Sequence, residues 1–189
     1  MLSVGIIAGH STRGSAERVW EYERCKEATA SLDTLLTTAG FTCLTVSSDI
    51  YSLTNDDALI EKIRFLNERR VDMAVELHLN AGGGDYSTCL YWDDAEGYFS
   101  EPGKQLAVEI ASQFKAAFPW RSIGAKGQTY FDRKLAFLHK TNMPAVITEA
   151  AFKDDPSHRT SMETKQGAVL YATSVFQGIC RYADGLQVA

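Results

Sequence analysis

The chain has 189 residues, of which 45% are hydrophobic, and this size and composition fit one compact domain with a sizeable core. Its formal net charge of −5 comes from interspersed acidic and basic residues, so the sequence gives no indication of a nucleic acid or an anionic membrane surface as a partner. We therefore expect a single domain over residues 1–189 that acts as a monomer.

No stretch approaches the ~20 apolar residues that span a bilayer, and the chain enters a predicted strand without a basic leader or a cleavage site. We expect a protein without an export signal that is made in the cytoplasm. The cysteines are scattered without a C-x-x-C spacing, which favours free, buried thiols. They are Cys25, Cys43, Cys89 and Cys180.

The first predicted element is a strand over residues 3–8, which ends at Gly9 and His10. A glycine-bounded loop at this point could hold a phosphate on backbone amides. The spacings G-x-G-x-x-G and G-x-x-x-x-G-K-[ST] are both absent, so we do not expect a nucleotide site. Taken alone, His10 is either an ordinary loop residue or a metal ligand.

A long helix is predicted over residues 15–39, with the serine at its start as the N-cap. At 100° per residue, its apolar stripe brings Glu21 onto the buried face, and Glu17 lies one turn earlier as a possible substitute. A buried carboxylate needs a partner, which could be a metal ion, Arg13 or Arg24. The stripe comprises Cys25, Ala28, Leu32, Leu35, Leu36 and Ala39.

The next segment predicts a strand and a second helix. The strand covers residues 41–46, and a connecting loop follows over residues 47–53. Thr54 and Asp57 have the spacing of a capping box and start a helix that ends near residue 70. This alternation of strand and helix continues along the chain.

A third strand is predicted over residues 71–81, and the glycines at 82–84 end it. Its apolar residues are typical of a strand inside an α/β sheet, where functional groups gather at the carboxyl edge. His78 and Asn80 lie at that end of the strand. Asn80 could support the His78 loop, contact a ligand or be a plain turn residue.

The middle of the chain predicts a strand over residues 87–92 and a helix over residues 102–118. Between them lies a polar and aromatic loop over residues 93–102. We place this loop after a strand that neighbours His78, so it could form one wall of a cleft or be an exposed acidic loop. The segment over residues 119–134 lacks periodicity, and we assign it no element.

The last third predicts a short strand over residues 136–138, followed by His139, which we expect at the surface or behind a site. Another strand covers residues 145–149. A charged, turn-rich stretch then contains His158, which we expect to be exposed. The closing helix is predicted over residues 161–182.

Strands that alternate with helices predict an α/β fold with three layers, a mainly parallel central sheet and helices on both faces. Parallel strands end at one edge, so His10, His78 and Glu149 should meet there, with Glu21 from the first helix. Two imidazoles, one carboxylate and an open position form a catalytic zinc set. Zn²⁺ lowers the pKa of a bound water to about 7, and Glu149 is free to move its proton, as amide hydrolysis requires.

The chain resembles the zinc-dependent N-acetylmuramoyl-L-alanine amidases of the type-3 amidase family, especially the catalytic domains of phage endolysins. The matching pieces are residues 7–11, Glu21, residues 77–81 and residues 144–152. The resemblance implies that His10, Glu21 and His78 hold Zn²⁺ and that Glu149 is the catalytic base. It also implies hydrolysis of the bond between N-acetylmuramic acid and L-alanine in peptidoglycan, by a phage or prophage lysin that acts on the cell wall after release.

The chain departs from that family pattern at three places. Residues 9–12 lack the second glycine pair of many members, Glu76 stands where a serine is usual, and alanines follow Glu149 where Asn or Gly often occurs. None of these departures removes a ligand. They bear instead on which peptidoglycan chemotype is cut.

Three other functions remain open on the residues alone. A zinc carboxypeptidase-like peptidase acting on wall peptides would use the same ligand set. A metal-free glycosidase would use Glu76 and Glu149 as its acid and base. A non-catalytic wall-binding module would hold a structural zinc without turnover.

Overall fold

The computed structural model describes residues 1–47 and 55–188. Its centre is a six-stranded sheet in the order β2-β1-β3-β6-β4-β5. All neighbouring strands are parallel except β4 and β6, which are antiparallel, so the predicted α/β fold with a mainly parallel sheet is confirmed. The strands are β1 (Ser3–Ala8), β2 (Thr42–Val46), β3 (Met73–Asn80), β4 (Tyr86–Tyr91), β5 (Arg121–Gly127) and β6 (Ala145–Phe152).

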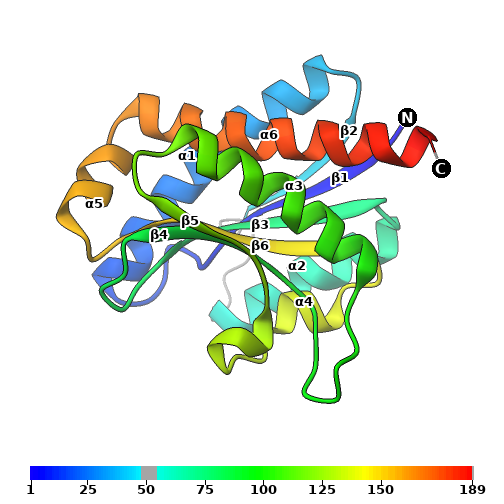
Figure 1. The fold of residues 1–189 in the computed structure, drawn as a ribbon, viewed down its shortest axis with the longest axis horizontal. Helices are drawn as coiled ribbons and strands as arrows, with labels where there is room; N and C mark the ends of the chain where they lie inside the picture. Colours follow the sequence, from blue (N-terminus) through cyan, green and yellow to red (C-terminus); the bar gives the residue numbers. More distant parts are fainter. Residues whose placement is uncertain (48–54, 189) are drawn as a thin grey trace.

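Helices cover both faces of the sheet, which gives the three expected layers (Figure 1). One face carries α1 (Ala16–Thr38), α3 (Glu101–Ala117) and α6 (Lys165–Val188). The other face carries α2 (Asn55–Arg69) and α4 (Ala136–Lys140). Two shorter elements complete the fold, the 3-10 helix η2 (Gln128–Phe131) and the helix α5 (Pro156–Met162).

Alternation along the strands divides the apolar residues between two cores. In β3, Val75 and Leu77 pack with α1, α3 and α6, whereas Ala74 packs with the other layer. The period of two in a strand explains this division. The same rule turns Glu76 and His78 toward α2 and α4, because they share the face of Ala74. A buried β3 therefore carries two ionisable groups on one side of the sheet.

The predicted N-cap of the first helix and the predicted burial of Glu21 are confirmed. Ser15 caps α1, and its Oγ accepts a hydrogen bond from the Arg18 amide at 3.4 Å. Glu21 is 1% exposed, as the helical phase predicts, whereas Glu17 lies at the surface and pairs with Arg159. Thr54 and most of the predicted loop at 47–53 lie outside the described residues.

Two predicted elements are wrong. Residues 136–138 are not a strand but the start of α4, because a run of three apolar residues does not distinguish the two. The closing helix is two helices, α5 and α6, since the N-cap Asp155 and Pro156 begin α5 early. The unassigned segment at 119–134 contains β5 and η2.

The loop after β4 is not a wall of the cleft beside His78. β6 lies between β3 and β4, and β4 runs antiparallel to β6, so β4 ends at the opposite edge of the sheet. Tyr98 in this loop is 70% exposed, which agrees with the exposed-loop interpretation. His139 is exposed, as expected, and accepts a hydrogen bond from the Trp92 indole at 3.2 Å.

His158 is buried, contrary to the expectation that it is exposed. It is only 2% exposed, and its Nδ1 accepts a hydrogen bond from the Phe152 amide at 2.9 Å. Its ring lies 3.9 Å from that of Trp120, between centroids. A turn-rich, charged sequence hides this burial because the ring partner, Trp120, comes from a distant segment.

The four cysteines are free, as predicted, and Cys25 and Cys89 are buried while the other two are half-buried. Within residues 1–47 and 55–188, the helices include none with the length and apolar character needed to cross a membrane.

Burial lowers the pKa of His158, so the native state favours its neutral form. The unfolded chain binds a proton near pH 6.5, and stability from this group is therefore present above that pH and is lost as the pH falls. We predict that His158→Asn, whose Oδ1 can replace Nδ1 as an acceptor, costs more free energy of unfolding at pH 7.5 than at pH 5.5. Urea unfolding of both proteins measures this, and an equal cost at the two pH values would contradict it.

Candidate active site

The structure brings His10, Glu21, His78 and Glu149 to one edge of the sheet. His10 follows β1, His78 lies near the end of β3 and Glu149 lies in β6, directly beside His78 in the strand register. Glu21 reaches the same point from α1. One ligand atom from each of His10, Glu21 and His78 lies within 4.8 Å of the others, which is a group that could hold a metal ion.

The Glu21 carboxylate is the centre of this cluster. Its Oε2 lies 3.1 Å from Nε2 of His10, and its Oε1 lies 3.0 Å from Nδ1 of His78. Oε2 also accepts a hydrogen bond from Lys153 Nζ at 2.6 Å, and Oε1 accepts one from the Leu79 amide at 3.0 Å. Neither arginine proposed from the sequence is this partner; the cation is Lys153.

Burial alone would raise the pKa of Glu21, but its hydrogen bonds with His10 and His78 lower it well below the usual range. The carboxylate is therefore ionised although it is 1% exposed. A buried anion surrounded by two imidazoles and an ammonium group is suited to a cation. The donors, two imidazole nitrogens and a carboxylate oxygen, are those that Zn²⁺ takes in catalytic sites.

The backbone at His10 is held in an uncommon conformation. His10 has a φ of 61°, in the left-handed region. Lys62, from α2, is 1% exposed and donates hydrogen bonds to the carbonyl oxygens of Ala8 at 3.1 Å and of His10 at 3.4 Å. These contacts direct the chain as it leaves β1 and place the two imidazole rings edge to face, with 4.9 Å between their centroids.

Gly9 allows His78 to approach the first strand. A methyl group at position 9 would overlap the imidazole ring of His78. The amide of Gly9 also donates to the carbonyl oxygen of Leu77 at 2.8 Å, which keeps the two strand ends together. The absence of a side chain is therefore required for the close packing of the two histidine segments.

Glu149 is 5% exposed, and its Oε1 lies 3.7 Å from the Arg133 guanidinium. Its Oε2 has no hydrogen-bond partner among the described residues. Burial, assisted by the negative charge of Glu21, raises the pKa of Glu149 to about 7. A buried carboxyl group with an unsatisfied oxygen and a pKa near neutrality has the properties of a general acid and base.

Tyr171 is a site residue that sequence reasoning missed. Its buried hydroxyl accepts from the His78 amide at 3.2 Å and lies within hydrogen-bonding distance of the His78 carbonyl, 3.0 Å, and the Thr148 hydroxyl, 2.6 Å. It thus joins β3 and β6 where the register shifts after His78. Tyr171 lies in the predicted closing helix, three residues after Ala168 and four before Val175, which are both buried, so the helical phase could have identified it.

The loop after β3 is also fixed by the segment after β6. Asp154 Oδ2 accepts hydrogen bonds from the amides of Gly82 at 2.7 Å and Gly83 at 3.0 Å. The Lys153 amide donates to the carbonyl oxygen of Asn80 at 2.9 Å, and the Asn80 side chain bonds the next amide. Asn80 therefore takes part in the turn after His78, through its carbonyl and its side chain, and it also lines the cleft.

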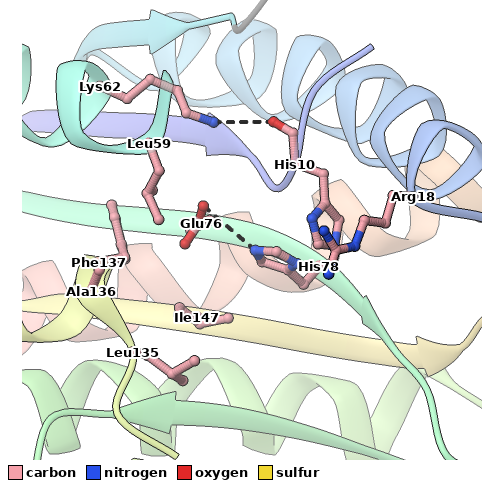
Figure 2. Close-up of a pocket in the computed structure, with 10 residues that line it drawn as sticks. All are labelled: His10, Arg18, Leu59, Lys62, Glu76, His78, Leu135, Ala136, Phe137 and Ile147. Carbon is pink, nitrogen blue, oxygen red and sulfur yellow. Dashed lines mark hydrogen bonds and ion pairs between the residues drawn. The ribbon is translucent and has the colours of Figure 1, made fainter. Parts of the chain in front are cut away.

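Two pockets meet at His10 and His78. One is lined by Glu21, Arg133, Glu149 and Lys153 in addition to the two histidines, and it contains the candidate catalytic groups. The other lies on the α2 and α4 side and contains Lys62 and Glu76 (Figure 2). The histidines thus separate an active-site cleft from a pocket behind it.

Comparison with protein families gives a match over residues 4–181 to the family Amidase_3, described as N-acetylmuramoyl-L-alanine amidase. A curated relative, an uncharacterized cell wall amidase of Bacillus anthracis, is 25% identical over 134 residues. The match covers 68% of this chain and 24% of that protein, so the chain spans about a quarter of the relative's length.

Solved structures share the fold. The catalytic domain of the CD27L endolysin targeting Clostridia difficile has a TM-score of 0.77 and 23% identity, with 96% of this chain and 98% of that chain covered. The apo amidase Ami1 from Mycobacterium abscessus has a TM-score of 0.81 and 19% identity, with coverage of 96% and 98%. The catalytic domain of the CwlV amidase from Bacillus (Paenibacillus) polymyxa has a TM-score of 0.79 and 17% identity, with 97% of this chain and 99% of that chain covered.

We predict that Gly9→Ala weakens Zn²⁺ binding at least ~10-fold, because the added methyl group displaces the His78 ring, and costs about 1–3 kcal/mol of stability through overpacking. Gly40→Ala is the control: Gly40 has a φ of 92° and open space around it, so alanine there is strained without touching the site. Competition with a chelator gives both affinities. Wild-type affinity in Gly9→Ala would contradict the prediction.

Proposed function

This chain belongs to the N-acetylmuramoyl-L-alanine amidase family, and from that premise we propose that it is a zinc-dependent peptidoglycan amidase. It hydrolyses the amide bond between the lactyl group of N-acetylmuramic acid and the first L-alanine of the stem peptide. The observation that carries the zinc dependence is the group formed by His10, Glu21 and His78, whose ligand atoms lie within 4.8 Å of one another.

We further propose that residues 1–189 form one catalytic domain and that the protein is a phage or prophage lysin. Coverage of 96% of this chain and 98% of an endolysin catalytic domain supports the single catalytic domain. The lysin proposal rests on the resemblance to that endolysin domain, with 23% identity. Its substrate is the cell wall, and it acts there after release from the cytoplasm. A monomer is sufficient, because every group in the proposed site comes from one chain.

In the proposed mechanism, His10, Glu21 and His78 hold the metal ion. Zn²⁺ at this position supplies a Lewis acid for the amide carbonyl and lowers the pKa of a water. Leu79 helps to keep Glu21 in place by donating its amide to Oε1. Lys153 compensates the charge of Glu21 in the structure, and it lines the same cleft as Glu149.

Glu149 moves the proton. It is positioned beside His78 in the register of β3 and β6. Its Oε2, which has no hydrogen-bond partner in the described part of the chain, is available to accept a proton from the attacking water. The water oxygen bonds to the carbonyl carbon, and the C–N bond then breaks. Glu149 returns the proton to the leaving nitrogen, which gives a lactyl carboxylic acid and a free amino group on L-alanine, and the acid then passes its proton to the amine or to solvent.

We predict that Glu149→Gln retains Zn²⁺ and loses about 10²–10⁴-fold in kcat, since the amide fills the same space but cannot take up a proton. Glu17→Gln is the matched control, because Glu17 is an exposed carboxylate of the helix that carries Glu21. Turnover on purified peptidoglycan and metal content by mass spectrometry measure the two properties. A Glu149→Gln enzyme as active as the control would remove Glu149 from the mechanism.

Product analysis of digested peptidoglycan tests the proposed reaction. We expect stem peptides with a free L-alanine amino terminus and loss of activity with a chelator. Release of a C-terminal amino acid would instead indicate the carboxypeptidase-like reaction. New reducing ends that persist with the chelator would indicate a glycosidase, and wall binding without any product would indicate a binding module.

A further inference from the structure

Glu76 is a buried carboxylate that the proposed reaction does not use. It is 3% exposed and lies two residues before His78 on the same face of β3. Its Oε1 is 3.5 Å from Nε2 of His78, on the side of the ring that faces the second pocket (Figure 2). A carboxylate in the middle of a central strand is costly, so its presence calls for a physical reason.

The two nitrogens of His78 face two different carboxylates. Nδ1 lies 3.0 Å from Oε1 of Glu21, in the candidate metal site, whereas Nε2 faces Glu76. An imidazole that binds a metal through Nδ1 presents a lone pair there and carries its hydrogen on Nε2. That N–H needs an acceptor when it is buried, and Glu76 Oε1, 3.5 Å from Nε2, is the carboxylate oxygen in position to accept it.

Lys62 makes the buried Glu76 tolerable. It enters from α2, is 1% exposed and lines the same pocket as Glu76. Its ammonium group donates to the carbonyl oxygen of Ala8 and to that of His10 (Figure 2), so it also fixes the segment that carries the first imidazole. Only the contact with His10 is drawn in the figure. Lys62 therefore fixes the segment that carries His10 and balances the charge of Glu76 beside His78.

We propose that Glu76 is a positioning residue for the metal site. Its carboxylate accepts the Nε2–H of His78, which fixes the tautomer of the ring and keeps Nδ1 directed at the ion, with Lys62 as the countercharge. Carboxylates that hold a metal-bound histidine in this way commonly strengthen metal binding about 10–100-fold. This inference rests on the proposed function, because it requires that His78 bind the ion.

The first test reads the tautomer of His78 in the wild-type protein. Long-range ¹H–¹⁵N NMR of protein with ¹⁵N-labelled histidine, titrated with Zn²⁺ alone, distinguishes the two ring nitrogens. We expect His78 to carry its hydrogen on Nε2 and to bind the ion through Nδ1. In the Zn²⁺-loaded protein, a hydrogen on Nδ1, or an ion bound at Nε2, would overturn the proposal.

The second test measures Zn²⁺ affinity by competition with a chelator. We expect Glu76→Leu to raise the Kd for Zn²⁺ about 10–100-fold, and Glu76→Gln to raise it less, because its side-chain oxygen can still accept the Nε2–H. Glu68→Gln, an exposed carboxylate of α2, is the control and keeps the wild-type Kd. Thermal unfolding of the metal-free proteins shows whether Glu76→Leu folds; if it does not, the Glu76→Gln affinity and the wild-type NMR spectrum decide.

Glu21→Gln separates this inference from the proposed function. If the wild type and Glu21→Gln bind Zn²⁺ equally, the metal site itself is wrong. If Glu21→Gln loses Zn²⁺ but both Glu76 variants keep the wild-type Kd, only the role of Glu76 is wrong. If Glu21→Gln loses Zn²⁺ and the Glu76 variants have a higher Kd for Zn²⁺ than the wild type, both the metal site and the role of Glu76 are supported.

Discussion

The structure depends on one buried carboxylate. Glu21 projects from α1 into a point where two strands end, and it contacts both imidazoles, His10 at 3.1 Å and His78 at 3.0 Å. Its negative charge would be expensive in the protein interior without these groups and Lys153. The arrangement therefore favours positive charge at this point, which Lys153 supplies in the structure and which we assign to a divalent cation in the proposed enzyme.

The fold supplies this site through strand order. β1, β3 and β6 are neighbours and run in parallel, so their carboxyl ends deliver His10, His78 and Glu149 to one edge. Contacts made by single residues then set the distances between the side chains. Gly9 lets the His78 ring approach β1, and the Tyr171 hydroxyl holds β3 and β6 together beside it. These contacts explain how groups far apart in sequence reach one small volume.

Sequence reasoning predicted much of this because the relevant signals are periodic. The helical phase identified Glu21 as buried, and strand ends identified the two histidines and Glu149. Roles that depend on tertiary contacts could not be predicted in the same way. Lys153 follows β6 in a charged stretch that suggested only a turn, although its ammonium group bonds Glu21. No local pattern predicts that His158 packs against Trp120, which lies in a distant segment. The same is true of the position of β6 between β3 and β4, which is set by long-range strand pairing.

Zinc-edge anomalous diffraction from crystals of the Zn²⁺-loaded protein tests the central claim most directly. The account predicts one ion about 2.0–2.2 Å from the imidazoles of His10 and His78 and from a Glu21 oxygen, with the Lys153 ammonium group withdrawn from Glu21. An ion bound elsewhere, or no ion together with an intact contact between Lys153 and Glu21, would contradict it.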